Sequence, residues 1–142
     1  MVRLAAVNDA EQLNTLNNEF NGEGETTLEN IINALLNNQQ EVVVVDEEGG
    51  VLAGFVCIQL KRSFCYDYYM PEITEVYVNP AYRRRGIASE MLIFAEDYCA
   101  KKYPLHQYEL LTGKNNIIAQ SVYGNLGYKN DNKIHLSKRT RE

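Results

Sequence analysis

The sequence predicts a mixed α/β (α+β) fold, in which a mostly antiparallel sheet contains one parallel βαβ unit and carries helices on both faces. Apolar residues alternate along the chain between helical stripes and β-branched runs. A strand, a helix and a strand follow one another over residues 73–111, which predicts two parallel neighbouring strands. The 142 residues show no linker, repeat or low-complexity segment, so we expect a single domain over 1–142.

The first elements are expected to be a short strand over 1–7 and two helices. Asn8, with Glu11 three residues later, has the spacing of a capping box and predicts the start of the first helix. The loop 21–25 contains two glycines and ends that helix. A second helix begins near Thr26. Its apolar residues have the spacing of one helical stripe: Leu28, Ile31, Ile32 and Leu35.

Two strands that form a hairpin come next. Residues 42–45 are a continuous β-branched run, which is typical of a strand covered on both faces. The acidic, glycine-containing turn 46–50 leads into a second strand over 51–60. Gly54 inside this strand indicates a bulge or a position of close packing. The connection 61–70 that follows is crowded with aromatic residues.

The βαβ unit begins with a strand over 73–78, which ends at Pro80 because proline cannot continue a sheet ladder. A helix over 86–102 and a strand over 108–111 complete the unit. The helix residues expected to face the sheet are Ile87, Met91, Leu92, Ala95 and Cys99.

Two further elements are expected after the βαβ unit. A helix over 116–126 is followed by Gly127, where a left-handed residue is wanted at the helix end. A strand over 134–136 is expected to be the last element. The predicted order is therefore β-α-α-β-β-β-α-β-α-β.

Composition argues against several kinds of site and partner. No apolar run approaches the roughly 20 residues that span a bilayer, and the first residues lack the features of a signal peptide, so we expect a cytoplasmic protein with no membrane partner. Three cysteines without a CxxC pair, and two histidines without ligand spacing, predict neither a disulfide framework nor a metal site. The net charge of -5 disfavours nucleic acid and favours a cationic ligand.

The most informative segment is the turn before the helix 86–102, where three arginines occupy 83–85. The first N–H groups of a helix have no intrahelical acceptor and lie at the positive end of its dipole. A pyrophosphate placed there accepts several hydrogen bonds, and Gly86 and Ala88 leave room for its approach. Neither a Walker A loop nor a Rossmann turn is present. The sequence therefore predicts an anion site here rather than a solvated basic patch.

This turn resembles the pyrophosphate signature of the GNAT superfamily of N-acetyltransferases, which reads Arg/Gln-x-x-Gly-x-Gly/Ala after a strand ending in Val-x-Pro and an aromatic residue. The matching residues are Val78, Pro80, Tyr82, Arg83, Gly86 and Ala88. A second family motif, N-x-x-A-x-x-x-Y-x-x-x-G followed by Phe or Tyr, is also complete. It is filled by Asn116, Ala119, Tyr123, Gly127 and Tyr128. The resemblance covers roughly residues 40–138.

The resemblance implies acetyl-CoA as the donor co-substrate, with no metal. In the family, the pantetheine arm lies in a gap between two splayed strands and pairs with the backbone of one of them. Carried over, Val76 and Val78 are the backbone partners, and the Val76 N–H polarises the thioester carbonyl. The residues implied for donor binding are Val76, Tyr77, Val78, Arg83, Arg84, Arg85, Gly86, Ile87, Ala88, Ser89, Asn116 and Tyr123.

The resemblance also implies catalytic roles. Tyr123 stands where the family places its general acid, with packing under the cofactor as the alternative. Glu75 is the first choice for the general base, with a purely electrostatic role as its alternative, and Glu72 is the other carboxylate. Because strand side chains alternate, we expect these two glutamates to point to opposite faces. We expect Asn116 to act as a helix N-cap. The loop 66–69 is read as an acceptor wall, a dimer contact or neither.

Three functions stay open at this point. The favoured one is an N-acetyltransferase acting on a primary amine of a small cationic molecule, aminoglycoside- or polyamine-like, ahead of a protein N-terminus or lysine. The second is a non-catalytic acetyl-CoA-binding module, against which the presence of Tyr123 counts. The third is nucleic-acid binding through 83–85 and 138–141, against which the acidic net charge counts. A homodimer also stays open.

Overall fold

The computed structural model describes residues 1–141, which form one five-stranded sheet in the order β1-β2-β3-β4-β5. All neighbouring strands are antiparallel except β4 and β5, which are parallel. The mixed α/β fold and the parallel βαβ unit are therefore confirmed. The strands are β1 (Val2–Leu4), β2 (Glu41–Glu48), β3 (Val51–Lys61), β4 (Met70–Val78) and β5 (Glu109–Leu110).

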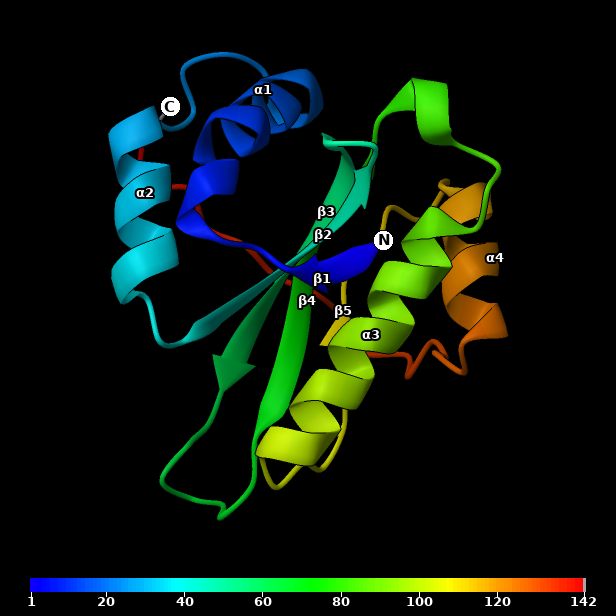
Figure 1. Ribbon diagram of the computed structural model, residues 1–142. Coiled ribbons are helices and arrows are strands. Elements are labelled where there is room, and N and C mark those ends of the chain that lie inside the picture. The colour runs from blue at the N-terminus through cyan, green and yellow to red at the C-terminus, as the bar shows by residue number, and fades with distance from the viewer. Residues whose placement is uncertain (142) are drawn as a thin grey trace.

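Four helices cover the two faces of the sheet, as Figure 1 shows. α1 (Ala10–Asn21) and α2 (Leu28–Asn37) lie on one face. α3 (Ile87–Lys102) lies on the other face, with α4 (Ile117–Asn125) beside it. No helix within residues 1–141 has the length and apolar character required to cross a membrane.

Each face of the sheet has its own apolar core. On one side, Leu13 and Leu16 of α1 pack with the buried residues Val45, Phe55 and Tyr77 of the strands. On the other side, α3 packs on alternate residues of β2, β3 and β4. The predicted inward residues of α3 are all buried there: Ile87, Met91, Leu92, Ala95 and Cys99. Burial of these side chains at roughly 25 cal/mol per Å² is the main force that fixes α3 against β4.

The start of α1 differs from the prediction. Asn8 lies in a short 3-10 turn (Val7–Asp9) and does not cap the helix, which begins at Ala10. Asp9 is buried, and its carboxylate accepts hydrogen bonds from both terminal nitrogens of Arg3 at 2.8 and 2.9 Å. A buried carboxylate is stable only when it is paired, so the Asp9 side chain binds the guanidinium of Arg3, and α1 begins one residue later than predicted.

Two other local predictions are refined by the structure. The N-cap of α2 is Thr27, one residue later than expected, and its hydroxyl accepts the N–H of Asn30 at 3.0 Å. Gly54 is a position of close packing, because a Cβ there would lie 2.4 Å from the carbonyl oxygen of Tyr77 on β4. Gly127 has a φ of 97° directly after α4, which confirms the left-handed residue expected there.

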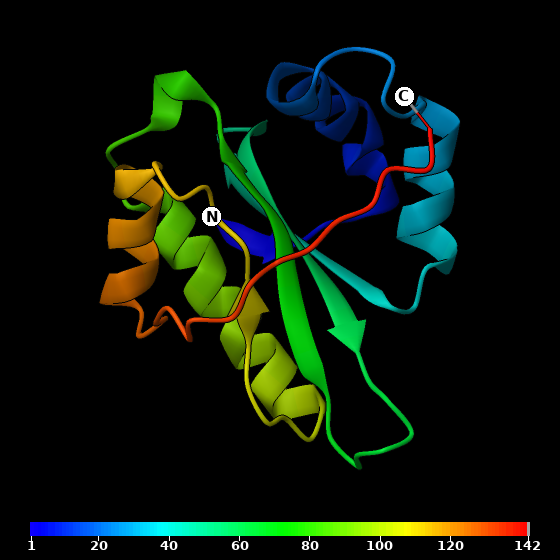
Figure 2. The same ribbon diagram turned by 180° about the vertical axis from the view of Figure 1, so that it is seen from behind.

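The predicted strand over 134–136 is absent from the described chain. Ile134 and Leu136 are 83% and 85% exposed, so no sheet face receives them. The neighbouring edge strand, β5, is only two residues long and offers too short a ladder for a sixth strand to pair with. Figure 2 shows this C-terminal segment crossing the β5 side of the sheet toward α2 without strand geometry.

Candidate active site

A β-bulge interrupts the pairing of β3 with β4. Cys57 lies opposite Glu75, and the next residue, Ile58, lies opposite Ile73. Thr74 is therefore an extra residue on β4 with no partner on β3. A bulge of this kind bends the strand that carries it and increases its local twist. From this point onward, β4 turns away from β5.

The consequence is that the second half of β4 has no paired strand on its β5 side, and we call this unpaired edge the gap beside β4. The pairing between β4 and β5 ends at Ile73. After β5, the chain runs away from β4 to α4 (Figure 2). On the opposite edge, the N–H of Asn79 donates to the carbonyl oxygen of Ala53 on β3 at 2.8 Å. Peptide groups of alternate residues point to opposite edges of a strand. The N–H and C=O groups of Val76 and Val78 therefore point into the gap, as the predicted donor site requires.

The turn that follows β4 holds two residues in the left-handed region. Gly86, the N-cap of α3, has a φ of 74°, and Arg84 has a φ of 65°. For a residue other than glycine this conformation costs about 1–2 kcal/mol, and such strain concentrates at functional sites. Within residues 1–141 no side chain caps α3. The N–H groups of residues 87–89 are thus free to bind an anion, and a Cβ at Gly86 would meet nothing within 4 Å.

The arginines surround this turn and are exposed to solvent. The Nε of Arg83 donates to the carbonyl oxygen of Val78 at 2.9 Å, and its guanidinium lies 5.8 Å from the ring centre of Tyr77. The guanidinium of Arg85 lies over the ring of Tyr82 at 5.3 Å. Tyr77 itself is buried on the α1 side, and its peptide groups face β3. The structure therefore places Tyr77 behind the gap, in contact with Arg83, rather than in the gap itself.

The second motif forms α4 and its ends. The side-chain oxygen of Asn116 accepts the N–H of Ala119 at 3.1 Å, which confirms its role as N-cap. The hydroxyl of Tyr128 donates to Glu96 of α3 at 2.6 Å and ties the end of α4 to α3. The hydroxyl of Tyr123 has no hydrogen-bond partner among residues 1–141. Burial raises the pKa of Tyr123, so its hydroxyl is protonated at neutral pH and available as a proton donor.

The two glutamates of β4 lie on the same face of the sheet, so the prediction that they point to opposite faces is wrong. Glu75 lies opposite Cys57, and Glu72 lies opposite Gln59, two residues further along β3. Residues two apart on a strand share a face, and so do residues directly across a ladder. The bulge at Thr74 supplies the extra residue that restores the phase. This face is the one that α1 and α2 cover in part.

Four carboxylates from neighbouring strands belong to this region, and they differ in their partners. Lys61 forms ion pairs with Glu72, at 3.4 Å, and with Glu109. Glu41 and Glu75 form no ion pair within residues 1–141. Burial raises the pKa of Glu41, and the negative charge of Glu75 raises it further. Glu41 and Glu75 are therefore two carboxylates on the same face of the sheet that no cation neutralises within residues 1–141.

Sequence reasoning missed Glu41 and the position of Cys57. Cys57 lies directly opposite Glu75, and Glu41 lies opposite Gln59 on the same face, while burial, followed by the charges of Glu41 and Glu75, raises the pKa of the Cys57 thiol well above its usual range. The available signal was phase, because Glu41 is two residues before Val43, and Val43 packs on the α1 side of β2. A bulge was needed to bring Glu75 onto the same face, and the sequence alone does not mark it.

The tyrosine-rich loop lies at the other end of β4 from the arginine turn. The rings of Tyr66 and Tyr68 stack with their centres 5.1 Å apart, and the ring centres of Tyr68 and His106 are 4.6 Å apart. The loop is thus packed against the segment that precedes β5, and its role in acceptor binding stays a prediction. Residues 1–141 contain no group of three or more potential metal ligands.

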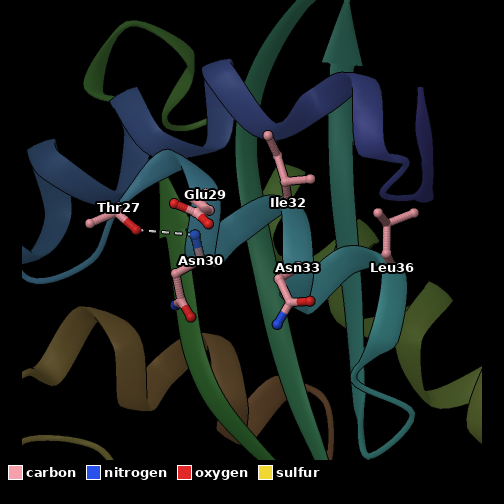
Figure 3. A pocket seen from close by; sticks show the side chains of 6 residues that line it. All are labelled: Thr27, Glu29, Asn30, Ile32, Asn33 and Leu36. Carbon is pink, nitrogen blue, oxygen red and sulfur yellow. Dashed lines mark hydrogen bonds between the residues drawn. The ribbon is translucent and has the colours of Figure 1, made fainter.

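A surface hollow of about 450 Å³ lies along the outer side of α2 (Figure 3). The side chains that line it all come from α2 and its N-cap: Thr27, Glu29, Asn30, Ile32, Asn33 and Leu36. It is separate from the gap beside β4 and contains a single ionisable side chain, Glu29. We therefore assign the chemistry to the gap and not to this hollow.

Comparison with known proteins agrees with this geometry. The model of the acetyltransferase (GNAT) family matches residues 9–128, which include the β4 gap, the arginine turn and α4. No curated protein sequence matches the chain. Solved structures nevertheless match over nearly the whole length, and their TM-scores of 0.82–0.85 show the shared fold.

Among these structures is the aminoglycoside acetyltransferase AAC(6')-Iy in complex with a bisubstrate analog, CoA-S-monomethyl-acetylneamine, with a TM-score of 0.85 and 16% identity over 99% of this chain and 98% of that chain. Another is an aminoglycoside acetyltransferase from an uncultured soil metagenomic sample in complex with sisomicin, with a TM-score of 0.85 and 14% identity over 100% and 96% of the two chains.

A third is a ribosomal-protein-alanine N-acetyltransferase from Brucella melitensis biovar Abortus 2308, with a TM-score of 0.82 and 14% identity over 98% of each chain. Two of these proteins are aminoglycoside acetyltransferases and the third is a ribosomal-protein-alanine N-acetyltransferase, so the shared fold does not select an acceptor. The family match covers most of the sequence and contains both predicted motifs. The chain therefore belongs to the acetyltransferase (GNAT) family and is an acetyl-CoA-dependent N-acetyltransferase.

Proposed function

We propose that the enzyme transfers the acetyl group of acetyl-CoA to a primary amine of a small cationic molecule, aminoglycoside- or polyamine-like. The observation that carries the proposal is that Glu41 on β2 and Glu75 on β4 lie on one face of the sheet without an ion-pair partner within residues 1–141. Neither carboxylate is neutralised by a cation within residues 1–141, so the region attracts a positively charged acceptor. The sisomicin complex of a structural neighbour supports the same class of acceptor.

The donor fits the residues on the opposite side of the gap. The free N–H groups of residues 87–89 provide the hydrogen bonds for a pyrophosphate, and the exposed arginines of the turn add positive charge. The peptide groups of Val76 and Val78 provide a strand edge for the pantetheine arm. The bound donor supplies the thioester, and every other function in the reaction belongs to side chains and peptide groups of the chain.

The proposed reaction removes two protons from the acceptor nitrogen and delivers one to the departing thiolate. Glu75, through a water molecule, accepts a proton from the ammonium group, because an alkyl amine with a pKa of about 10.4 is protonated near neutral pH. The amine nitrogen then forms a bond to the carbonyl carbon and releases its second proton to solvent, and the carbon–sulfur bond breaks. The Val76 N–H stabilises the negative charge that develops on the oxygen. Tyr123 donates its proton to the departing thiolate, and solvent returns one to the phenolate.

The test is release of free thiol from acetyl-CoA with a panel of acceptors at matched concentration. The panel contains an aminoglycoside, a polyamine, a peptide with a free N-terminal alanine and a peptide whose only amine is a lysine side chain. We expect turnover with at least one of the first two and little with either peptide. Turnover confined to a peptide would overturn the choice of acceptor while leaving the donor assignment intact.

A further inference from the structure

Glu19 in the last turn of α1 joins that helix to the end of β4. One oxygen of its carboxylate accepts two hydrogen bonds, from the hydroxyl of Tyr77 at 3.0 Å and from the side-chain amide nitrogen of Asn79 at 2.9 Å. Tyr77 is the penultimate residue of β4, and Asn79 directly precedes the turn that leads to the arginines. Glu19 belongs to neither family motif.

The bond from Asn79 to Glu19 fixes which way the Asn79 amide points. An asparagine side chain has a donor end and an acceptor end. With its nitrogen bound to Glu19, the oxygen of Asn79 accepts the N–H of Ala81 at 2.9 Å and caps the short helix Pro80–Tyr82. That short helix ends where the arginine turn begins. Glu19 thus determines the cap that sets the entry into the turn.

The bond from Tyr77 acts on Arg83. The ring of Tyr77 is stacked on Phe20, the residue after Glu19, with ring centres 5.0 Å apart. The guanidinium of Arg83 lies over the same ring at 5.8 Å while its Nε binds the carbonyl oxygen of Val78. Tyr77 is therefore held by α1 from one side and supports Arg83 from the other.

We propose that Glu19 is a positioning residue for the donor pyrophosphate, which it reaches through Asn79 and Tyr77 without touching the donor. The proposal rests on the donor site described under the proposed function. Its physical content is specific: the carboxylate acts as a hydrogen-bond acceptor, and its negative charge works against a nearby pyrophosphate. An uncharged acceptor of the same shape should therefore replace it, whereas truncation should not.

The experiment measures the Kd of CoA by calorimetry for the wild type and four variants. We expect Glu19→Ala to weaken CoA binding about tenfold, because both bonds are lost, and Glu19→Gln to stay within about threefold of the wild type. Tyr77→Phe removes one hydroxyl and keeps the ring, so we expect a loss of a few-fold. Glu11→Ala, the same change in the first turn of the same helix on an exposed side chain, should leave the Kd unchanged.

A double-mutant cycle separates positioning from general destabilisation. If Glu19 acts through the Arg83 turn, then Glu19→Ala adds less than twofold to the loss already caused by Arg83→Ala. Losses that multiply in full would overturn the proposal, and so would a Glu19→Ala protein that binds CoA like the wild type. If Glu19→Ala does not fold, wild-type affinity in both Glu19→Gln and Tyr77→Phe would overturn it. A wild type that does not bind CoA would instead refute the donor site itself.

Discussion

Glu72 and Glu75 lie on the same face of β4 although three residues separate them, because Thr74 forms a bulge between them. The bulge has two effects at once. It brings Glu75 onto the same face of the sheet as Glu41 and Cys57. It also precedes the part of β4 that no longer pairs with β5, where the peptide groups of Val76 have no strand partner. The proposed donor and acceptor sites therefore share one structural element, the bulge at Thr74.

The two glutamates should nevertheless differ in function. Glu72 is already paired with Lys61, whereas Glu75 has no cationic partner within residues 1–141. We expect Glu75→Gln to lower kcat by roughly 10²-fold or more, since a general base contributes about 10²–10⁴-fold, and Glu72→Gln to change kcat by less than about threefold. Both variants keep their size and lose one charge, so each is a control for the other. Equal losses of kcat would show that only the negative potential matters.

Tyr123→Phe should reduce kcat by roughly 10²-fold or more with little change in the Kd of CoA, because the ring is kept and only the proton donor is lost. Burial raises the pKa of Tyr123, so the wild type should keep its acid form above pH 10, and its alkaline loss of kcat should be missing in the variant. The measurement is kcat against pH for both proteins.

Tyr128→Phe provides the matched control for Tyr123→Phe. It removes a hydroxyl that binds Glu96, so it should lower the free energy of unfolding by about 1–3 kcal/mol and leave kcat nearly unchanged. If Tyr123→Phe instead lost stability and kept kcat, its role would be packing and not catalysis.

Gly86→Ala should destabilise the protein through the backbone alone. The φ of 74° costs a residue with a Cβ about 1–2 kcal/mol, while no neighbouring atom blocks the added methyl group. Lower entropy of the unfolded chain offsets part of this, so we expect a net loss of about 1 kcal/mol in urea unfolding. Gly113→Ala, at a glycine without positive φ, should be neutral or stabilising. A stabilised Gly86→Ala protein would refute the conformation described for the turn.

The Arg3–Asp9 pair should make stability depend on pH in acid. Hydrogen bonds from Arg3 hold the pKa of Asp9 below its ordinary value, against the opposing effect of burial. A lowered folded pKa stabilises the protein fully above the unfolded pKa of about 3.9, and the contribution is lost as the pH falls through the folded pKa. Asp9→Asn should therefore cost about 1–3 kcal/mol at pH 7 and less at pH 3, where part of the contribution is lost. The measurement is urea unfolding of the wild type and Asp9→Asn at both pH values. An equal loss of unfolding free energy at pH 7 and pH 3 would contradict a contribution from the ion pair.

The periodic elements and the turn were predictable because their signals are local. The apolar stripe of α3 and the arginine turn before Gly86 each lie within one short segment of sequence. Both were predicted at the correct residues. The predicted start of α1 was wrong because the Asp9 carboxylate binds Arg3, a residue of β1, and this contact is not visible in the sequence around Asn8.

The candidate acceptor region depends on contacts between strands, which the sequence of one segment does not specify. A bulge is an extra residue in one strand relative to its partner, so Thr74 could not be identified as a bulge from the sequence of β4 alone. The prediction that Glu72 and Glu75 point to opposite faces was wrong for that reason. The prediction of a strand at 134–136 was wrong because alternating apolar residues form a strand only beside a partner edge of sufficient length. β5 is too short to provide that edge. Glu19 was missed because it lies far in sequence from the turn that it orders.

The most direct test of the donor site is thermal unfolding of the purified protein with acetyl-CoA, with CoA and with ATP as an unrelated phosphate ligand. A ligand present at about 100 times its Kd adds roughly 2.7 kcal/mol to the free energy of unfolding, which raises the Tm of a domain of this size by roughly 5–10 °C. We predict this rise with acetyl-CoA and with CoA, and none with ATP. A cooperative transition whose Tm does not respond to either CoA species would contradict the assignment of the β4 gap and the Arg83–Ser89 turn as the donor site.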